Sequence, residues 1–107
     1  MKKEYMKLIR DRIPEIIEAN GQTAHIRVLS EEEYVSALEK KLIEEIGEYL
    51  ESKELSELAD ILEVVQALAE NQGISINELL AIKEEKQCKN GAFRKKLFLE
   101  SVESHGV

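Results

Sequence analysis

Cysteine, proline, tryptophan and long apolar runs are scarce or missing in this chain of 107 residues. It has one Cys, one Pro and no Trp, and aromatic residues make up 5% of it. The single Cys88 excludes an intramolecular disulfide, and one Cys with two His at these spacings excludes a zinc cluster. No apolar run reaches the length of a signal peptide or a membrane span, so we expect a cytoplasmic protein with no membrane association.

An excess of positive charge is also missing. The net charge of −7 argues against binding to nucleic acid polymers or to anionic membranes. Residues 31–63 hold twelve acidic residues against three Lys, whereas residues 83–96 hold six Lys and Arg against two Glu. Most of these charges are typical of a solvated helical surface. An anionic ligand bridged to carboxylates by a metal would need one zone of each sign.

What the chain does contain is typical of a small helical protein. Its hydrophobic content of 43% and charged content of 35% come largely from residues that favour helices. At this length we expect a single domain over residues 1–107. Its core would be modest, and pairing with a second copy would enlarge it.

Local signals define the ends of the chain's shorter elements. Pro14 suits the first turn of a short helix that Asn20-Gly21 would end. The segment 25–29 carries a weak signal for a short strand or an extended piece. A capping box predicts a helix over residues 76–90, which a glycine ends, and the basic and apolar tail at 92–100 is expected to be extended.

The middle of the chain predicts a helical hairpin. Ser30 with Glu33 forms a capping box for a long helix that runs to about Leu50. After a short turn, Ser56 is the expected N-cap of a second helix, which ends at Gln72-Gly73.

The helical wheel puts several acids on the apolar side of this hairpin. At roughly 100° per residue, Glu45 borders the apolar stripe of the first long helix, Glu48 lies beside it, and Glu44 points nearly opposite. In the next helix Glu57 falls within the apolar arc and Asp60 lies close to its edge. The apolar arc of that helix is so wide that we expect it to be buried on most sides, within its own fold or against a partner copy.

Two pairs of acids in this hairpin are each three residues apart, Glu45 with Glu48 and Glu57 with Asp60. Side chains at this spacing share one helix face and can reach a single ion. A buried carboxylate is costly unless it is paired or coordinates a metal. Oxygen ligands without Cys or His favour Mg²⁺ or Mn²⁺. For either pair alone a solvated surface is the alternative, but two pairs on the buried side together favour a metal site.

The acids also carry a family resemblance. The sequences EEIGE at residues 44–48 and ELAD at residues 57–60 resemble the E-E-x-x-E and E-x-x-D motifs of the all-α nucleoside triphosphate pyrophosphohydrolases, a superfamily that includes MazG and the dimeric dUTPases. KLIRDRIP at residues 7–14 and NGAFRKK at residues 90–96 resemble its phosphoribosyl-ATP pyrophosphohydrolase-like subgroup. The acidic motifs are separated by eight residues, fewer than in many MazG members.

The resemblance implies hydrolysis of the α–β phosphoanhydride of a nucleoside triphosphate or a phosphoribosyl-ATP-like substrate, with a monophosphate and pyrophosphate as products. Carried over to this chain, Mg²⁺ or Mn²⁺ would polarise the phosphate and help to generate a nucleophilic water. Glu45 or Glu44 would orient that water, with a solvated surface role as the alternative for Glu44. The implied metal ligands are Glu45, Glu48, Glu57 and Asp60.

Basic residues would then bind the substrate phosphates. Arginine suits bidentate phosphate contact, whereas lysine acts as a point charge. For any one of these residues a solubilising surface charge is the alternative. The predicted substrate-binding residues are Arg10, Lys86, Arg94 and Lys95.

We therefore predict an all-α fold in which the hairpin and a third helix form a four-helix-type bundle core through homo-oligomerisation, as a homodimer or a tetramer. The predicted function is that of a Mg²⁺-dependent nucleotide pyrophosphohydrolase. One alternative is a non-catalytic helical module that binds a nucleotide or a protein partner on the same scaffold. Another is a plain dimerisation module, whose stability would not depend on metal.

Overall fold

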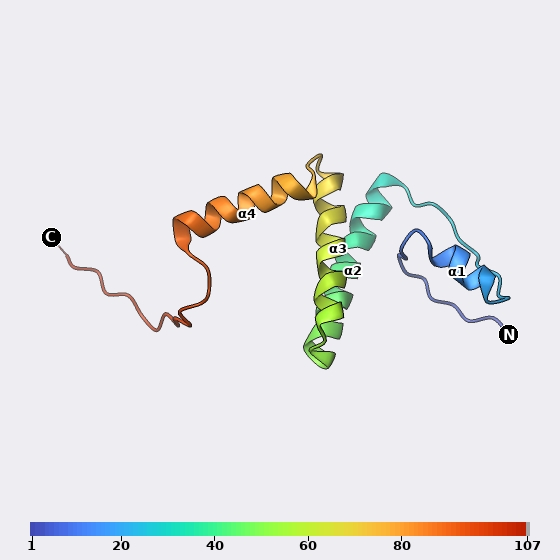
Figure 1. Ribbon diagram of the computed structural model, residues 1–107, viewed down its shortest axis with the longest axis horizontal. Coiled ribbons are helices and arrows are strands. Elements are labelled where there is room, and N and C mark those ends of the chain that lie inside the picture. The colour runs from blue at the N-terminus through green and yellow to red at the C-terminus, as the bar shows by residue number, and fades with distance from the viewer. Residues whose placement is uncertain (107) are drawn as a thin grey trace. The chain divides into compact units, whose positions relative to one another are not determined.

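The computed structural model describes residues 1–106 of the chain (Figure 1). These residues contain four α-helices and no strand, which confirms the predicted all-α class. They form two compact units, one over Met1–Ser75 and one from Ile76 onward. No described helix combines the length and the apolar content needed to cross a membrane. The helices are α1 (Ile13–Ala19), α2 (Glu31–Ser52), α3 (Leu55–Asn71) and α4 (Ile76–Asn90).

Of the two alternatives for residues 25–29, the strand is wrong, because this segment has no regular structure. A strand needs a neighbour to accept and donate its backbone hydrogen bonds, and no other strand exists in the described part of the chain. The side chain of Val28 is almost fully exposed, so the alternation of apolar residues here does not reflect burial.

The capping box at the start of α2 is confirmed. The Ser30 hydroxyl accepts a hydrogen bond from the Glu33 backbone N–H at 3.3 Å, and the Glu33 carboxylate accepts one from the Ser30 backbone N–H at 3.1 Å. Arg27 also forms an ion pair with Glu33 at 3.2 Å. The hydrogen bonds from Arg27 and Ser30 lower the pKa of Glu33 to about 2, so this carboxylate stays charged at every ordinary pH.

Removal of the capping hydroxyl is expected to weaken the hairpin. Ser30→Ala leaves the Glu33 N–H without its acceptor, and we expect a loss of about 1 kcal/mol in the free energy of unfolding. Urea denaturation followed by circular dichroism measures the loss. Ser36→Ala, inside α2, is the matched control and is expected to leave stability unchanged or slightly raised, because alanine is the better helix former. Equal losses in the two variants would contradict a specific role for the cap.

A tight link joins α2 to α3. Lys53 adopts the left-handed conformation with φ of 60°, and its backbone N–H donates to the Tyr49 carbonyl at 2.7 Å. The predicted cap at Ser56 is wrong, because α3 already begins at Leu55 with Glu54 as its N-cap. The Glu54 backbone N–H is bound by the Ser52 hydroxyl at 3.2 Å, so the turn is held from the α2 side.

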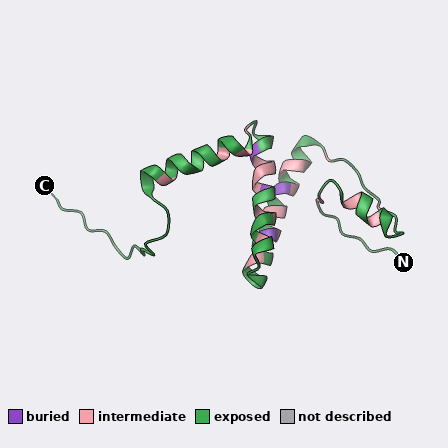
Figure 2. Ribbon diagram, in the orientation of Figure 1, coloured by how far each residue is buried: buried purple, intermediate pink, exposed green. Residues whose placement is uncertain are grey.

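The core of the first unit lies between α2 and α3, which pack against each other (Figures 1 and 2). Its buried apolar residues are Leu38, Val64 and Ala69. Much of the hairpin's apolar surface remains exposed, and a hairpin with so small a core buries little of the area that stabilises larger domains. The large apolar side chains left exposed on the hairpin are Ile43, Ile46, Leu50, Leu55, Leu58 and Leu62.

Candidate metal-binding site

Three carboxylates from the two packed helices meet in the first unit. Glu45 comes from α2, and Glu57 and Asp60 come from α3. One oxygen from each of them lies within 4.8 Å of the others. The structure therefore brings together three of the four predicted metal ligands, and it does so across the hairpin rather than along one helix.

Glu45 is the buried member of this cluster. The residue is 7% exposed, and its Oε2 atom is buried with no hydrogen-bond partner. Burial raises the pKa of the Glu45 carboxyl above its ordinary value of 4.5, the Glu48 carboxyl raises it further, and Lys41 opposes the rise. Burial, together with the nearby charges of Asp60 and Glu45, also raises the pKa of Glu57. The site thus disfavours its own negative charge, and a cation would relieve that cost.

Glu48, the fourth predicted ligand, lies outside the three-residue cluster. Its side chain is exposed, but it lines the same pocket as Glu45 and is close enough to raise the pKa of that residue. The spacing of three residues within α2 thus places Glu48 at the rim of the site.

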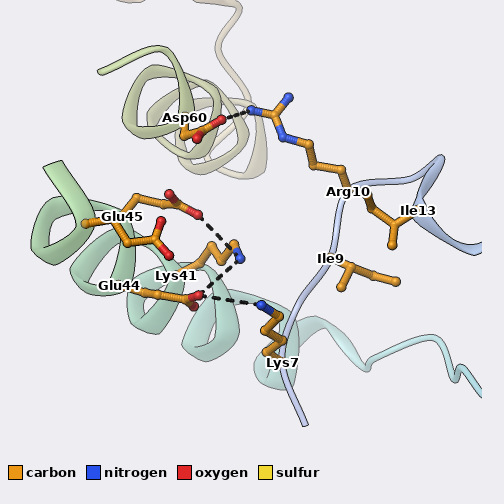
Figure 3. A pocket seen from close by; sticks show the side chains of 9 residues that line it. Lys7, Ile9, Arg10, Ile13, Lys41, Glu44, Glu45 and Asp60 are labelled. Carbon is orange, nitrogen blue, oxygen red and sulfur yellow. Dashed lines mark hydrogen bonds and ion pairs between the residues drawn. The ribbon is translucent and has the colours of Figure 1, made fainter. Parts of the chain in front are cut away.

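A pocket of about 270 Å³ opens beside the carboxylates (Figure 3). The segment that precedes and begins α1 forms one wall, through Lys7, Ile9, Arg10 and Ile13, and the acidic side chains form the other. Segments far apart in the sequence therefore build the pocket together. The lining acids are Glu44, Glu45, Glu48 and Asp60, and Lys41 completes the lining.

Glu44 lies in this pocket, which corrects the outward direction given by the helical wheel. Its carboxylate is 3.6 Å from the Lys41 Nζ and 3.8 Å from the Lys7 Nζ, as Figure 3 shows. The wheel considers only the contact of α2 with α3. The N-terminal segment covers another flank of α2, and Glu44 faces that segment.

Lys41 and Lys7 are site residues that the sequence analysis missed. The Lys41 side chain is 17% exposed, and its Nζ lies 3.4 Å from a Glu45 oxygen. The signal was present, since Lys41 is four residues before Glu45 and must share its helix face. Nothing local indicates Lys7, because its place depends on how the N-terminal segment folds back onto α2.

Arg10 reaches the site, where its guanidinium binds carboxylates. Its guanidinium donates to Asp60 at 2.7 Å and to Glu63 at 3.5 Å. About half of the Arg10 side chain is exposed. Arg10, which the sequence predicts to bind phosphate, is therefore held at the carboxylate cluster by its contact with Asp60.

The other three predicted substrate-binding residues, Lys86, Arg94 and Lys95, belong to the second unit. Lys86 lies on α4. Arg94 and Lys95 line a hollow of about 640 Å³ formed by residues 90–97. Gly91, which follows α4, has a φ of 87°, a conformation that suits glycine and ends the helix as predicted. These residues form a basic segment within the second unit.

Comparison with known proteins gives one partial relative and no family. Over 42 residues, 39% of this chain, the sequence is 57% identical to an uncharacterized protein of Mycolicibacterium smegmatis. That match covers 43% of the relative, so the chain spans less than half of its length. No protein-family model matches the chain, and no solved structure matches it.

Proposed function

We propose that this protein is a Mg²⁺-dependent nucleotide pyrophosphohydrolase of the MazG-like, all-α type. It would cleave the α–β phosphoanhydride of a nucleoside triphosphate or a phosphoribosyl-ATP-like substrate. The observation that carries the proposal is the buried Glu45, whose Oε2 lacks a hydrogen-bond partner and whose neighbours are further carboxylates. A purely structural carboxylate at such a position would be expected to have a donor for each oxygen.

The residues present fit a hard divalent cation. Glu45, Glu57 and Asp60 would hold it, and Glu48 at the rim would complete the ligand set, since oxygen ligands suit Mg²⁺ or Mn²⁺. When bound, such an ion supplies charge neutralisation at the phosphate and lowers the pKa of a water molecule.

The neighbouring side chains have roles of their own in the proposed reaction. Glu44 lines the pocket and is the carboxylate that we assign to orienting the attacking water, with Glu45 as the alternative. Lys7, Arg10 and Lys41 would contribute positive charge beside the phosphates. Phosphate binding by Lys86, Arg94 and Lys95, which belong to the second unit, stays a prediction of the sequence analysis.

A second candidate is a non-catalytic module on the same scaffold. The ion pairs of Arg10 with Asp60 and of Lys41 with Glu45 favour this alternative, because they partly neutralise the carboxylate cluster without any metal. The unpartnered oxygen of Glu45 favours the enzyme.

The test of the proposed function is an assay of pyrophosphate release. A panel of canonical and damaged nucleoside triphosphates and phosphoribosyl-ATP is incubated with the protein and Mg²⁺ or Mn²⁺. Metal-dependent release from one class of substrate is the expected result. No cleavage of any member by folded protein would favour the binding module.

We also propose that the hairpin pairs with the hairpin of a second copy to form a four-helix core. The apolar side chains exposed on α2 and α3, such as Ile46 and Leu62, support this assembly, because leaving them in water costs free energy. A homodimer satisfies the proposal with one interface, and a tetramer would need a second.

Charged substitutions on the hairpin are expected to dissociate the homodimer. In a symmetric interface each substitution occurs twice, so Ile46→Glu or Leu62→Glu should raise the dimer dissociation constant about a hundredfold or more. Sedimentation velocity across a concentration series measures this constant. Ile26→Glu is the control, since Ile26 is exposed outside the hairpin. Unchanged dissociation in both hairpin variants would contradict the proposed interface.

A further inference from the structure

Part of the acidic charge at this site is already balanced by basic side chains before any ligand binds. Lys7, Arg10 and Lys41 line the pocket together with four acidic residues, and Glu57 belongs to the adjoining carboxylate cluster. A divalent cation that binds the cluster would compete with these basic side chains for the same carboxylate oxygens. A basic side chain that loses its carboxylate partner in this way becomes available to bind an anion.

Arg10 is the internal cation most directly in competition with a metal. Its Nη2 lies 2.7 Å from Asp60 Oδ1, and Asp60 belongs to the three-carboxylate cluster. Its second contact, with Glu63 at 3.5 Å, lies outside that cluster. An oxygen that accepts a short, charge-assisted hydrogen bond is less available to a cation. The other two basic residues contact Glu44 and Glu45 at longer distances, from 3.4 to 3.8 Å.

Arg10 also has room to move. Its backbone is held just before α1, where the Arg10 carbonyl accepts a hydrogen bond from the Ile13 N–H at 3.1 Å, but about half of its side chain is exposed. The guanidinium stays charged at all ordinary pH values and binds phosphate as readily as carboxylate. Moving it from Asp60 into the pocket would exchange one anionic partner for another.

We propose that Arg10 is an exchangeable counter-ion of the carboxylate cluster: it neutralises Asp60 in the metal-free protein, leaves Asp60 when a divalent cation binds, and then binds an anionic phosphate group in the pocket. This inference rests on the proposed function, because it assumes that the carboxylates bind a metal. It adds a coupling that the proposed function does not require. Metal binding frees the phosphate-binding group, and by linkage phosphate favours metal binding.

The first test is the affinity for Mn²⁺ alone, measured by titration calorimetry. Arg10→Gln removes the competing charge, and we expect it to bind Mn²⁺ roughly two- to fivefold more tightly than the unchanged protein, as befits a half-exposed ion pair. Arg12→Gln is the matched control, because the ion pair described for Arg12 is with the exposed Glu15 and not with a residue of the carboxylate cluster. Its affinity should equal that of the unchanged protein.

The second test follows the Arg10 guanidinium directly by nuclear magnetic resonance. Its ¹⁵N–¹H signals, assigned by their absence in Arg10→Gln, should exchange with solvent faster on saturation with Mg²⁺. Subsequent addition of inorganic phosphate should slow that exchange again. Phosphate added without Mg²⁺ should have a much smaller effect, because Asp60 still holds the guanidinium.

The outcomes separate this inference from the proposed function. Weaker or unchanged Mn²⁺ binding in Arg10→Gln overturns the exchange while leaving the metal site intact, since Arg10 would then be positioning Asp60 or be a bystander. Guanidinium signals that do not respond to Mg²⁺ in a protein that binds it overturn the exchange in the same way. If none of the three proteins binds Mn²⁺, both the metal site and the exchange are wrong.

Discussion

Pyrophosphate release is expected to fall about a hundredfold or more in both Glu45→Gln and Asp60→Asn, since loss of a metal ligand should cost at least as much as loss of the groups that support it. Each substitution keeps the shape of the side chain and removes one of the three charges that meet across the hairpin. The rate is measured on the preferred substrate at saturating Mg²⁺, together with the Mg²⁺ concentration that gives half of the maximal rate.

The control for this experiment lies on the same helix. Glu39 is an exposed residue of α2 outside the pocket, so Glu39→Gln should retain the full rate. Glu48→Gln is informative in a different way. A large loss would assign the rim carboxylate to the site, and a small loss would limit the ligand set to the three clustered residues. Full activity in both Glu45→Gln and Asp60→Asn would rule out the cluster as the catalytic metal site.

The second large effect concerns stability. Mn²⁺ at one hundred times its dissociation constant should stabilise the folded protein by about 2.7 kcal/mol, which for a chain of this size raises the melting temperature by roughly 10–20 °C. Glu45→Gln should abolish most of this shift. Without metal, the same variant should be more stable than the unchanged protein by about 1 kcal/mol, because it removes a charge from a buried position among other acids. Thermal melts with and without metal measure both effects.

The pH dependence of the metal-free protein gives an independent check. The pKa of Glu45 is raised above 4.5 in the folded state, so the folded state takes up a proton at higher pH than the unfolded chain. The contribution of Glu45 to stability should therefore increase as the pH falls from neutral through its raised pKa, and it should be complete below 4.5, where the lowered pKa of Glu33 begins to act in the opposite direction. Glu45→Gln should show a smaller increase. If the melting temperature of the unchanged protein is the same with and without Mn²⁺, a plain dimerisation module is favoured instead.

The helices and their ends could be predicted because their signals are local. The capping box at Ser30, the glycine after α4 and the proline at the start of α1 each act within a few residues, and each element begins or ends close to the expected place. The expected N-cap at Ser56 lies two residues after the observed one at Glu54, because the turn that precedes α3 lets the helix begin at Leu55.

The carboxylate cluster could be predicted in part, and the basic side of the pocket could not. The helical wheel places Glu45 at the border of one apolar stripe, Glu57 within the apolar arc of the next helix and Asp60 close to its edge, and these three carboxylates meet in the structure. The contact of Arg10 with Asp60 joins residues fifty positions apart, so no periodicity could reveal it. The same applies to Glu44, whose direction depends on the N-terminal segment that packs over α2.

The two-residue link at Lys53 and Glu54 constrains how a hairpin of this kind can change in length. A residue inserted into the helical part of the interval, in α2 after Glu45 or in α3 before Glu57, would shift the helical phase by about 100° and carry Glu57 and Asp60 away from Glu45. Growth of the helices that keeps the acids opposed has to add residues to both together, about 3.6 to each for every further turn. Lengthening or shortening of the helices between the acidic motifs should therefore come in matched halves, which changes the interval between the motifs in steps of about seven residues.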